Sequence, residues 1–440
     1  MFGTSGVRGP IGREVTAETA LSIGRAVATT GAAQVVVGRD VRDTGRMLVD
    51  ALAAGVVECG GDVVDLGVVS TPTVARSVPR TGADVGVVVT ASHNPPADNG
   101  IKLWTSEGRA FGTEHRSEIE SVVLDGAYDF ADWDGNGTRR TSGVAEREHT
   151  DQLVATFDGQ VDCSVVVDVG NGTGGLTADV LDRVGCEVQT LNARPDGSFP
   201  GRPSEPTAAN CSTLRKVVAA TDADIGIAHD GDADRMRAAD ANGEFVGGDA
   251  LLALFAREAI DEGGAVTAPL NTSLAVDRAL EERGGEVVRT PVGDVHVAEK
   301  AAEIGAAFGG EPSGAWIWPA ETPCPDGPLA ACELVRLVAE RGPLDTLVDE
   351  LPSYPIRRDA IEVDGPTDLM VSVTETLLER YADVSTLDGV RVATDDGWFL
   401  VRASGTQPLI RLTAEATTAV EADRLLERAR NVVEERLADE

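Results

Sequence analysis

A serine stands where an apolar run of the sequence ends. Residues 85–89 read Val-Gly-Val-Val-Val, and Thr-Ala-Ser92 follows them before a polar turn that closes at Lys102. In open α/β sheets, the loops beyond the carboxyl ends of strands carry the chemistry. Ser92 is therefore a candidate nucleophile or phosphate carrier. The alternative is a turn in which Ser92 and its neighbours only satisfy local backbone groups.

A second apolar run, residues 225–228, leads into an acidic loop. The loop carries carboxylates at alternating positions, Asp230, Asp232 and Asp234. Oxygen ligands at this spacing favour one hard cation, Mg²⁺, Mn²⁺ or Ca²⁺. An EF-hand needs a glycine and an acid where this loop has Arg235 and Ala241, so that type of calcium site is excluded. The remaining alternative is a solvated acidic loop in an acidic protein.

A third strand end resembles the first two. Residues 306–308 run into Gly-Gly-Glu-Pro-Ser-Gly, which supplies Glu311 and Ser313. Three apolar runs that each end in a polar loop indicate an internal repeat. We therefore expect three similar units, each of which sends one loop into a shared crevice.

A fourth polar loop, residues 402–408, follows near the carboxyl end of the chain. It offers hydroxyls, backbone N–H groups and, with a nearby strand, two guanidinium groups: Ser404, Gly405, Thr406, Arg402 and Arg411. Donors of this kind suit a phosphate cradle. A β-turn with unrelated arginines is the alternative.

A glycine-rich segment, Gly-Asn-Gly-Thr-Gly-Gly at 170–175, matches the pattern of a dinucleotide-binding turn. Such a site also needs an acidic residue at the end of the next strand. That strand is expected at 187–191 and ends at Asn192 instead. We interpret the glycines as a tight turn between a strand and a helix, and not as a nicotinamide site.

Apolar runs alternate with amphipathic segments over most of the chain. Strands are expected at 34–37, 62–66 and 164–169, with a helix at 45–58 between the first two. This alternation predicts mostly parallel sheets with helices on both faces. Beyond residue 355, short strands among helices and a long charged final helix predict a separate α+β domain with an antiparallel sheet.

The charge of the chain is strongly acidic. It has 38 basic and 73 acidic residues, a net charge of −35 and only three lysines, and its pI is about 4.4. An acidic surface argues against nucleic acid and anionic membranes as partners, and it suits a halophilic protein. Against this background Lys102 is of interest, because a lysine can lose its proton where its environment lowers the pKa.

The cysteine pattern and the absence of targeting signals indicate a cytoplasmic protein. The six cysteines are scattered without a Cys-x-x-Cys pair, as expected of buried thiols in a reducing compartment. No apolar stretch is long enough to span a bilayer, and no signal-peptide pattern begins the chain. Both a monomer and a homodimer are compatible with this sequence.

The four loops, taken in order, carry a resemblance. Thr-Ala-Ser-His-Asn-Pro…Asn-Gly-Ile-Lys, Asp-Gly-Asp-Ala-Asp-Arg, Gly-Gly-Glu-Pro-Ser-Gly and Arg-Ala-Ser-Gly-Thr-Gln-Pro resemble the motifs of the α-D-phosphohexomutase superfamily. The match extends over essentially the whole chain, from the initial Phe-Gly-Thr-Ser-Gly-Val-Arg-Gly. Gly-Arg-Asp40 and Pro-Val-Gly-Asp294 look like secondary motifs of the same family.

The resemblance implies a four-domain enzyme that moves a phosphoryl group between the 1- and 6-positions of a hexose. Its fold class would be α/β, with three similar mixed α/β domains and a smaller C-terminal α+β domain around a central cleft. We place these domains at 1–142, 143–243, 244–352 and 353–440.

The resemblance also assigns chemistry to the loops. Ser92 matches the phosphoserine, which makes a hexose 1,6-bisphosphate intermediate that turns over and returns its other phosphate. One Mg²⁺ per chain would be held by this residue and by Asp230, Asp232 and Asp234. The sugar-reading residues would be Glu311 and Ser313. The non-reacting phosphate would be held by Arg402, Ser404, Gly405, Thr406 and Arg411.

Four residues complete the expected site. Lys102 is the hypothesised general acid/base for the sugar hydroxyl, and Arg8 and Arg235 are expected to help hold phosphate and loop. His93 is either a structural hydrogen-bonding residue or a catalytic one.

Two positions depart from the family pattern. Ala315 stands where the sugar loop often has histidine, and Gln407 stands where the phosphate loop usually has glutamate. The Gly-Glu-Pro-Ser-Gly form is most similar to that of family members that convert glucosamine 6-phosphate to glucosamine 1-phosphate. Mannose and glucose phosphates are alternative substrates, and a non-catalytic sugar-phosphate-binding protein is a further alternative.

Overall fold

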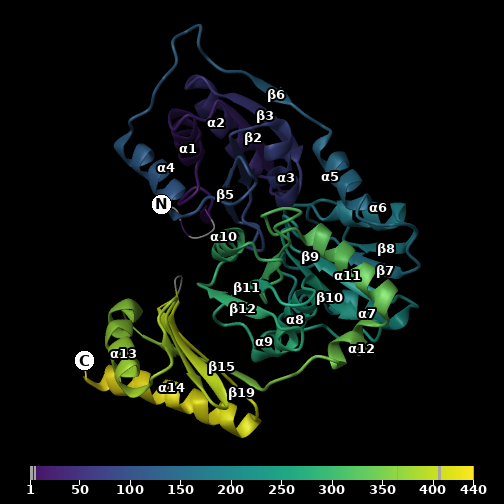
Figure 1. Ribbon diagram of the computed structural model, residues 1–440. Helices are drawn as coiled ribbons and strands as arrows, with labels where there is room; N and C mark the ends of the chain where they lie inside the picture. Colours follow the sequence, from purple (N-terminus) through teal and green to yellow (C-terminus); the bar gives the residue numbers. More distant parts are fainter. Residues whose placement is uncertain (1–2, 4–5, 364, 405–407, 440) are drawn as a thin grey trace.

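Four stretches of the chain each form one β-sheet in the computed structural model, which describes residues 3, 6–363, 365–404 and 408–439 (Figure 1). The first sheet is built with β1 (Val7–Pro10), α1 (Ala17–Thr29), β2 (Gln34–Arg39), α2 (Gly45–Glu58), β3 (Asp62–Val68), α3 (Thr71–Thr81), β4 (Val85–Val89), β5 (Asp98–Thr105), α4 (Thr113–Asp125) and β6 (Arg139–Thr141). Its strand order is β1-β5-β4-β2-β3-β6. The valines of β2 and β4 are buried because helices cover both faces of the sheet.

The second and third sheets have four strands each. The second uses α5 (Ala145–Val154), β7 (Ser164–Asp168), α6 (Gly175–Arg183), β8 (Glu187–Leu191), α7 (Ser212–Ala220), β9 (Ile225–His229) and β10 (Met236–Asp240). The third uses α8 (Gly248–Ala259), β11 (Ala265–Pro269), α9 (Leu274–Glu281), β12 (Glu286–Thr290), α10 (Asp294–Ile304), β13 (Phe308–Gly310), β14 (Trp316–Ile317), α11 (Gly327–Arg341) and α12 (Leu344–Asp349). Their strand orders are β10-β9-β7-β8 and β12-β11-β13-β14.

The fourth sheet is antiparallel throughout, as the sequence predicted. It contains β15 (Ile356–Glu362), α13 (Pro366–Arg380), β16 (Val384–Ser385), β17 (Val390–Thr394), β18 (Gly397–Ala403), β19 (Leu409–Ala416) and α14 (Ala419–Asp439). Helices α13 and α14 pack on one face and share its apolar core. On the other face, Trp398 and Leu400 contact Leu270 of the third unit. This smaller unit lies beside the third sheet (Figure 1).

The first three sheets are mixed, whereas the alternation of strands and helices predicted mostly parallel sheets. In each of them a strand that is parallel to its inner neighbour runs into a polar loop and returns as an antiparallel strand. The three pairs are β4 and β5, β9 and β10, and β13 and β14. The internal repeat is therefore visible in the topology. The loops of the three pairs meet in space, because Ser92 contacts Asp230 and Arg235 forms a bridge with Ala315.

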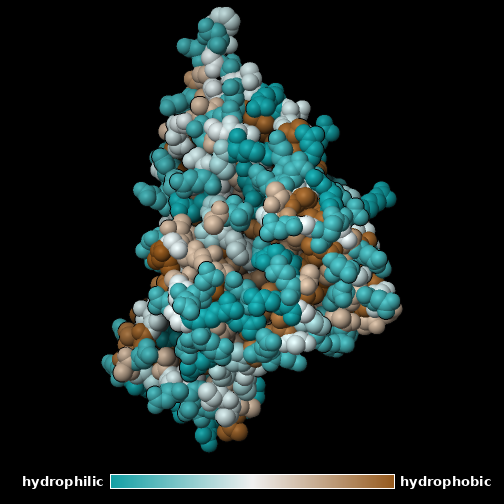
Figure 2. Space-filling model, turned by 45° about the vertical axis from the view of Figure 1, so that its right-hand side comes forward, coloured by the Kyte–Doolittle hydropathy of each residue, from teal (hydrophilic) through white to brown (hydrophobic). Residues whose placement is uncertain are grey.

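The predicted turn at the glycine-rich segment is present. Residues 170–174 join β7 to α6, and Gly170 adopts a φ of 62°. Among the described helices, none is long and apolar enough to cross a membrane. Figure 2 shows a face that is hydrophilic over most of its area, with separate brown patches. The four domain boundaries given above remain predictions.

Candidate active site

Ser92 lies in the loop between β4 and β5 and faces the acidic loop of the second unit. Its hydroxyl Oγ is 2.6 Å from Asp230 Oδ2 and 3.4 Å from Asp234 Oδ1. The side chain is only 1 % exposed, and the backbone has a φ of 50°. A non-glycine residue in this region costs ~1–3 kcal/mol, and such strain gathers at functional sites.

A buried network holds Ser92 in this conformation. Thr90 Oγ1 accepts a hydrogen bond from Ser92 N (2.8 Å) and donates one to Asp40 Oδ2 (2.7 Å). Arg42 pairs with Asp40 and donates through Nη2 to the Ser92 carbonyl oxygen at 2.9 Å. Ser204, which precedes α7, donates to the same oxygen at 2.9 Å. The serine loop is thus fixed from two units at once.

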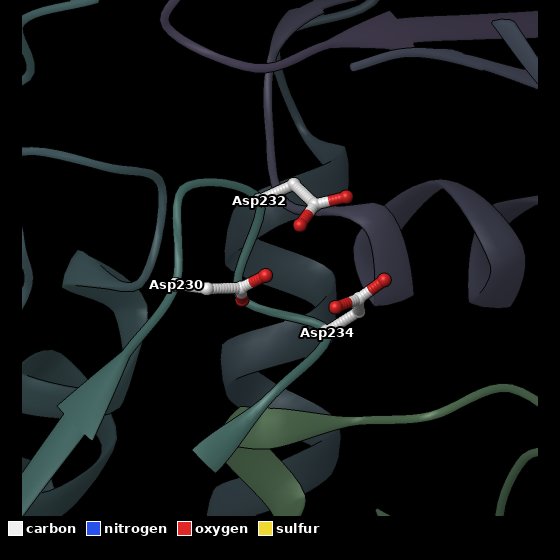
Figure 3. Close-up of side chains that lie close together, drawn as sticks. All are labelled: Asp230, Asp232 and Asp234. Carbon is white, nitrogen blue, oxygen red and sulfur yellow. The ribbon is translucent and has the colours of Figure 1, made fainter. Parts of the chain in front are cut away.

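The three aspartates converge in the return between β9 and β10 (Figure 3). One carboxylate oxygen of each lies within 4.8 Å of the others, and all three side chains are buried. Ala233 adopts a φ of 57°, which gives the loop the tight curve that turns alternate side chains inward. Thr71, at the start of α3, donates to Asp232 Oδ2 at 2.7 Å.

This carboxylate cluster fits a divalent cation. Burial, followed by the charges of Asp234 and Asp232, raises the pKa of Asp230 well above its usual value. Asp232 Oδ1 is buried and has no hydrogen-bond partner among the described residues. Buried carboxylates without enough positive charge are costly, and a hard cation removes that cost. The arrangement therefore agrees with the oxygen-only metal site that the sequence predicted.

Lys102 projects from β5 into the same cluster. Its Nζ lies 2.7 Å from Asp234 Oδ2 and 3.4 Å from Asp232 Oδ2. Burial by itself lowers the pKa of Lys102, but the two carboxylates outweigh burial and raise the pKa above its usual value. The environment therefore favours the ammonium form, which is the opposite of the pKa-lowering environment considered from the sequence.

His93 and Arg8 lie at the edge of the Ser92 loop. Burial, together with the charges of Arg235 and Arg8, lowers the pKa of His93 to about 3. His93 Nδ1 is 3.4 Å from Ser92 Oγ, so a neutral imidazole faces the hydroxyl. Arg8, on β1, donates to Asn94 Oδ1 at 3.4 Å and is held beside the Ser92 loop.

The third loop is joined directly to the acidic loop. Arg235 and Ala315 form an antiparallel bridge, and Met236 N donates to the Gly314 carbonyl oxygen at 3.0 Å. Ala315, where the family often has histidine, therefore takes part in this bridge through its backbone. The backbones of the loop that carries the three aspartates and of the loop that carries Glu311 form one unit.

Glu311 and Ser313 lie together in that loop. Ser313 Oγ donates to Glu311 Oε2 at 3.0 Å, and Gly293 N donates to Glu311 Oε1 at 2.7 Å. Burial, with a smaller effect of Asp294, raises the pKa of Glu311. A carboxylate held in this way can accept hydrogen bonds from sugar hydroxyls.

The fourth loop is described only in part, because Gly405, Thr406 and Gln407 lie outside the described residues. Arg402 and Arg411 are direct partners across β18 and β19. Ser404 is buried, and its Oγ has no hydrogen-bond partner among the described residues. Between described residues, no hydrogen bond joins this loop to Ser92 or to the three aspartates.

Sequence reasoning missed the residues that position the site. Arg42, Thr71 and Ser204 each contact a loop that is distant in sequence. His229 is another: its Nδ1 donates to the Arg235 carbonyl oxygen, and Thr177 lies 2.9 Å from its Nε2. The one available signal was the Gly-Arg-Asp40 motif, which lies at the end of β2 and supplies the partner of Arg42.

Comparison with protein families gives matches along the whole chain. Four models of the phosphoglucomutase/phosphomannomutase family match: alpha/beta/alpha domain I at residues 1–128, domain II at 147–243, domain III at 247–354 and the C-terminal domain at 364–432. The four matches follow one another in the order of the four sheets.

Individual relatives agree with the family match. The chain is 46% identical to a probable phosphoglucosamine mutase of Methanopyrus kandleri, over 99% of this chain and 98% of the relative. It is 45% identical to a protein of the same name from Methanothermobacter thermautotrophicus, with the same coverage. In structure it is similar to a phosphoglucomutase/phosphomannomutase family protein of Burkholderia thailandensis, with a TM-score of 0.89, 30% identity and coverage of 99% and 98%.

Proposed function

The chain belongs to the phosphoglucomutase/phosphomannomutase family of α-D-phosphohexomutases, and we propose that it interconverts glucosamine 6-phosphate and glucosamine 1-phosphate. The observation that carries the proposal is the position of Ser92 Oγ, 2.6 Å from Asp230 Oδ2 in a buried carboxylate cluster. The names of the relatives at 41% to 46% identity support glucosamine phosphate as the substrate.

The proposed reaction has two phosphoryl transfers through Ser92. In the first, the bond between phosphorus and Ser92 Oγ breaks while a sugar hydroxyl oxygen bonds to phosphorus and its proton leaves. The hexose 1,6-bisphosphate then turns over in the cleft. In the second transfer its other phosphate passes to Ser92 Oγ, and a hydroxyl is regenerated on the sugar. Phosphoryl transfer of this kind depends mainly on positioning and on neutralisation of charge.

Mg²⁺ is the cation that we propose for the carboxylate cluster, because all the ligands are oxygens. Asp230, Asp232 and Asp234 would hold it together with the phosphate on Ser92. When bound, the cation supplies positive charge to the transferring phosphate and takes up carboxylate charge that otherwise favours protonated Lys102.

Lys102 is the group to which we assign proton exchange with the sugar hydroxyl. Its Nζ reaches the cluster through Asp234 and Asp232. Neutral His93 at 3.4 Å from Ser92 Oγ is suited to a hydrogen bond that orients the serine. Arg8 and Arg235 lie beside these groups and would balance the charge of the phosphate.

Substrate binding is proposed to use the third and fourth loops. Glu311 would accept hydrogen bonds from the sugar hydroxyls, and Ser313 would donate hydrogen bonds to them. The non-reacting phosphate would lie against the fourth loop, on Arg402, Ser404, Gly405, Thr406 and Arg411.

We place the enzyme in the cytoplasm, because its six cysteines are free and five of them are buried, which suits a reducing compartment.

Steady-state rates on three substrates test the proposal. The 1-phosphates of glucosamine, glucose and mannose are supplied with Mg²⁺ and a trace of the matching 1,6-bisphosphate, and formation of the 6-phosphate is measured. We expect kcat/KM to be highest for glucosamine by ~10-fold or more, the discrimination that one buried polar contact can give. Ser92→Ala is the control and should be inactive. A higher kcat/KM for mannose or glucose would reject glucosamine as the main substrate.

A further inference from the structure

A single turn of the third unit touches carboxylates from two different units. Val292 N donates to Asp388 Oδ2 at 3.1 Å, and the next amide, Gly293 N, donates to Glu311 Oε1 at 2.7 Å. Gly293 has a φ of 135°, which side chains rarely adopt. This conformation allows two successive backbone amides to donate hydrogen bonds to two different carboxylates. This turn is the Pro-Val-Gly-Asp294 motif at the start of α10.

The same Asp388 oxygen holds an arginine of the fourth loop. Arg402 Nη1 lies 2.7 Å from Asp388 Oδ2. Asp388 is itself fixed, because Gly389 approaches β18 so closely that a Cβ there would lie 2.5 Å from the Val401 carbonyl oxygen. Both side chains of the pair are partly exposed, at 28% for Asp388 and 22% for Arg402. The other N–H groups of Arg402 can therefore still reach a ligand.

We propose that Asp388 is a positioning residue that sets the spacing between the sugar-reading Glu311 and the phosphate-reading Arg402. The connection runs from Glu311 through the amides of Gly293 and Val292 to Asp388 and Arg402. It rests on the proposed function, because it assumes that one sugar phosphate spans both residues. A sugar phosphate that contacts both Glu311 and Arg402 gains affinity from both only when the distance between them already matches the ligand.

Binding to a chain that cannot turn over gives the direct test. Glucosamine 6-phosphate is titrated calorimetrically into the Ser92→Ala chain, with and without Asp388→Asn. The asparagine keeps the shape, and its amide oxygen can still accept from Val292 N, but the negative charge that pairs with Arg402 is lost. We expect Kd to rise ~10-fold, which corresponds to about 1.4 kcal/mol. Asp395→Asn, an exposed aspartate of the same unit, is the matched control and should leave Kd within about twofold of the parent.

A second readout separates positioning from loss of structure. In the chain with Ser92 intact, Asp388→Asn should raise KM for the sugar phosphate by ~10-fold while kcat stays within about threefold, as expected when binding is lost equally from ground and transition states. Thermal melting of each variant identifies any general loss of folding. An unchanged Kd would overturn the proposal, and so would a tighter Kd, because Asp388 would then compete with the phosphate for Arg402.

These outcomes are distinct from a failure of the proposed function. Absence of mutase turnover in the chain with Ser92 intact would reject the phosphoserine mechanism. The Kd comparison uses a chain without that serine, so it still decides whether Asp388 positions Arg402. Inorganic phosphate serves as a second probe that cannot reach Glu311 and Arg402 together. Asp388→Asn should change the Kd of inorganic phosphate by less than it changes the Kd of the sugar phosphate. An equal change would overturn the proposal that Asp388 sets the spacing between Glu311 and Arg402.

Discussion

Single residues determine how charge is arranged around Ser92. Burial and the charges of Asp234 and Asp232 raise the pKa of Asp230, while the same two carboxylates hold Lys102 as an ammonium group. The Nδ1 atom of neutral His93 lies 3.4 Å from Ser92 Oγ. Lys102 balances carboxylate charge, and we propose that it also exchanges a proton with the sugar hydroxyl.

Lys102→Arg separates these two tasks. Arginine keeps the positive charge but does not give up its proton in proteins. We expect kcat to fall ~100-fold or more, which is within the range for loss of a general acid/base. Steady-state rates with saturating sugar phosphate measure it. Lys300→Arg is the control, since Lys300 is paired on the surface with Glu303. Unchanged turnover in Lys102→Arg would show that its proton is not used.

The sequence predicted the residues proposed to carry the chemistry, which the structure brings together, better than the residues that hold them in place. Ser92 and Asp230 could be found because each follows an apolar strand directly. Arg42 and Asp388 could not, because their partners are separated from them by many residues and are brought near only by the fold. Two residues of the predicted phosphate cradle, Gly405 and Thr406, lie outside the described structure.

Three helices from the first three units meet at one buried polar cluster. Asp326, the N-cap of α11, accepts from Arg76 of α3 at 2.7 Å and lies 3.2 Å from His149 of α5. His149 Nδ1 lies 2.8 Å from Thr73, also on α3. Because α3 begins with Thr71, which contacts Asp232, this cluster supports the loop that carries the three aspartates.

Asp326→Asn tests the cluster through its pH dependence. Burial raises the pKa of Asp326, but Arg76 and His149 outweigh it and hold the pKa well below its usual value. A lowered folded pKa stabilises the protein above the unfolded pKa of about 3.9, and this stabilisation is lost as the pH falls below that value. We expect the variant to lose about 3 kcal/mol of unfolding free energy at pH 7.

Urea unfolding at pH 7 and at successively lower pH measures this loss. The difference from the parent should shrink as the pH falls below about 4. Asp151→Asn is the control, because its ion pair with Arg183 is exposed, and it should change stability by less than about 1 kcal/mol. A loss for Asp326→Asn that is the same at every pH would contradict the role of its charge.

Among the secondary-structure elements, the long ones were the most predictable. The helix at 45–58 has the predicted bounds. The prediction of mostly parallel sheets was incomplete, because an apolar pattern does not give the direction in which a strand pairs: β5, with eight residues, is antiparallel to β4. The return strand β14 has only two residues and gave no periodic signal.

The whole molecule carries an excess of negative charge, and its folded state concentrates that charge. The net charge is −35, and Figure 2 shows a largely hydrophilic face. Self-repulsion of this size opposes compact structure when screening is weak. The prediction of a halophilic protein from the sequence stays a prediction, and its physical consequence can be measured.

Salt should stabilise the protein. Raising KCl from about 0.1 M to about 1 M shortens the screening length from ~10 Å to ~3 Å, so we expect Tm to rise and mutase activity to be retained or increased. Differential scanning calorimetry and steady-state rates measure the two. Sucrose at equal osmolarity is the control for non-ionic stabilisation. A chain that is most stable and fully active only in dilute buffer would contradict this account.

Mass spectrometry of the intact chain and its peptides shows whether Ser92 carries the phosphate. After incubation with glucosamine 1,6-bisphosphate and Mg²⁺, one phosphate per chain should be found on the peptide that contains Ser92. Addition of excess glucosamine 6-phosphate should remove it, and Ser92→Ala should never acquire it. A chain that turns over substrate without phosphate on Ser92, or a Ser92→Ala chain with normal turnover, would contradict the account.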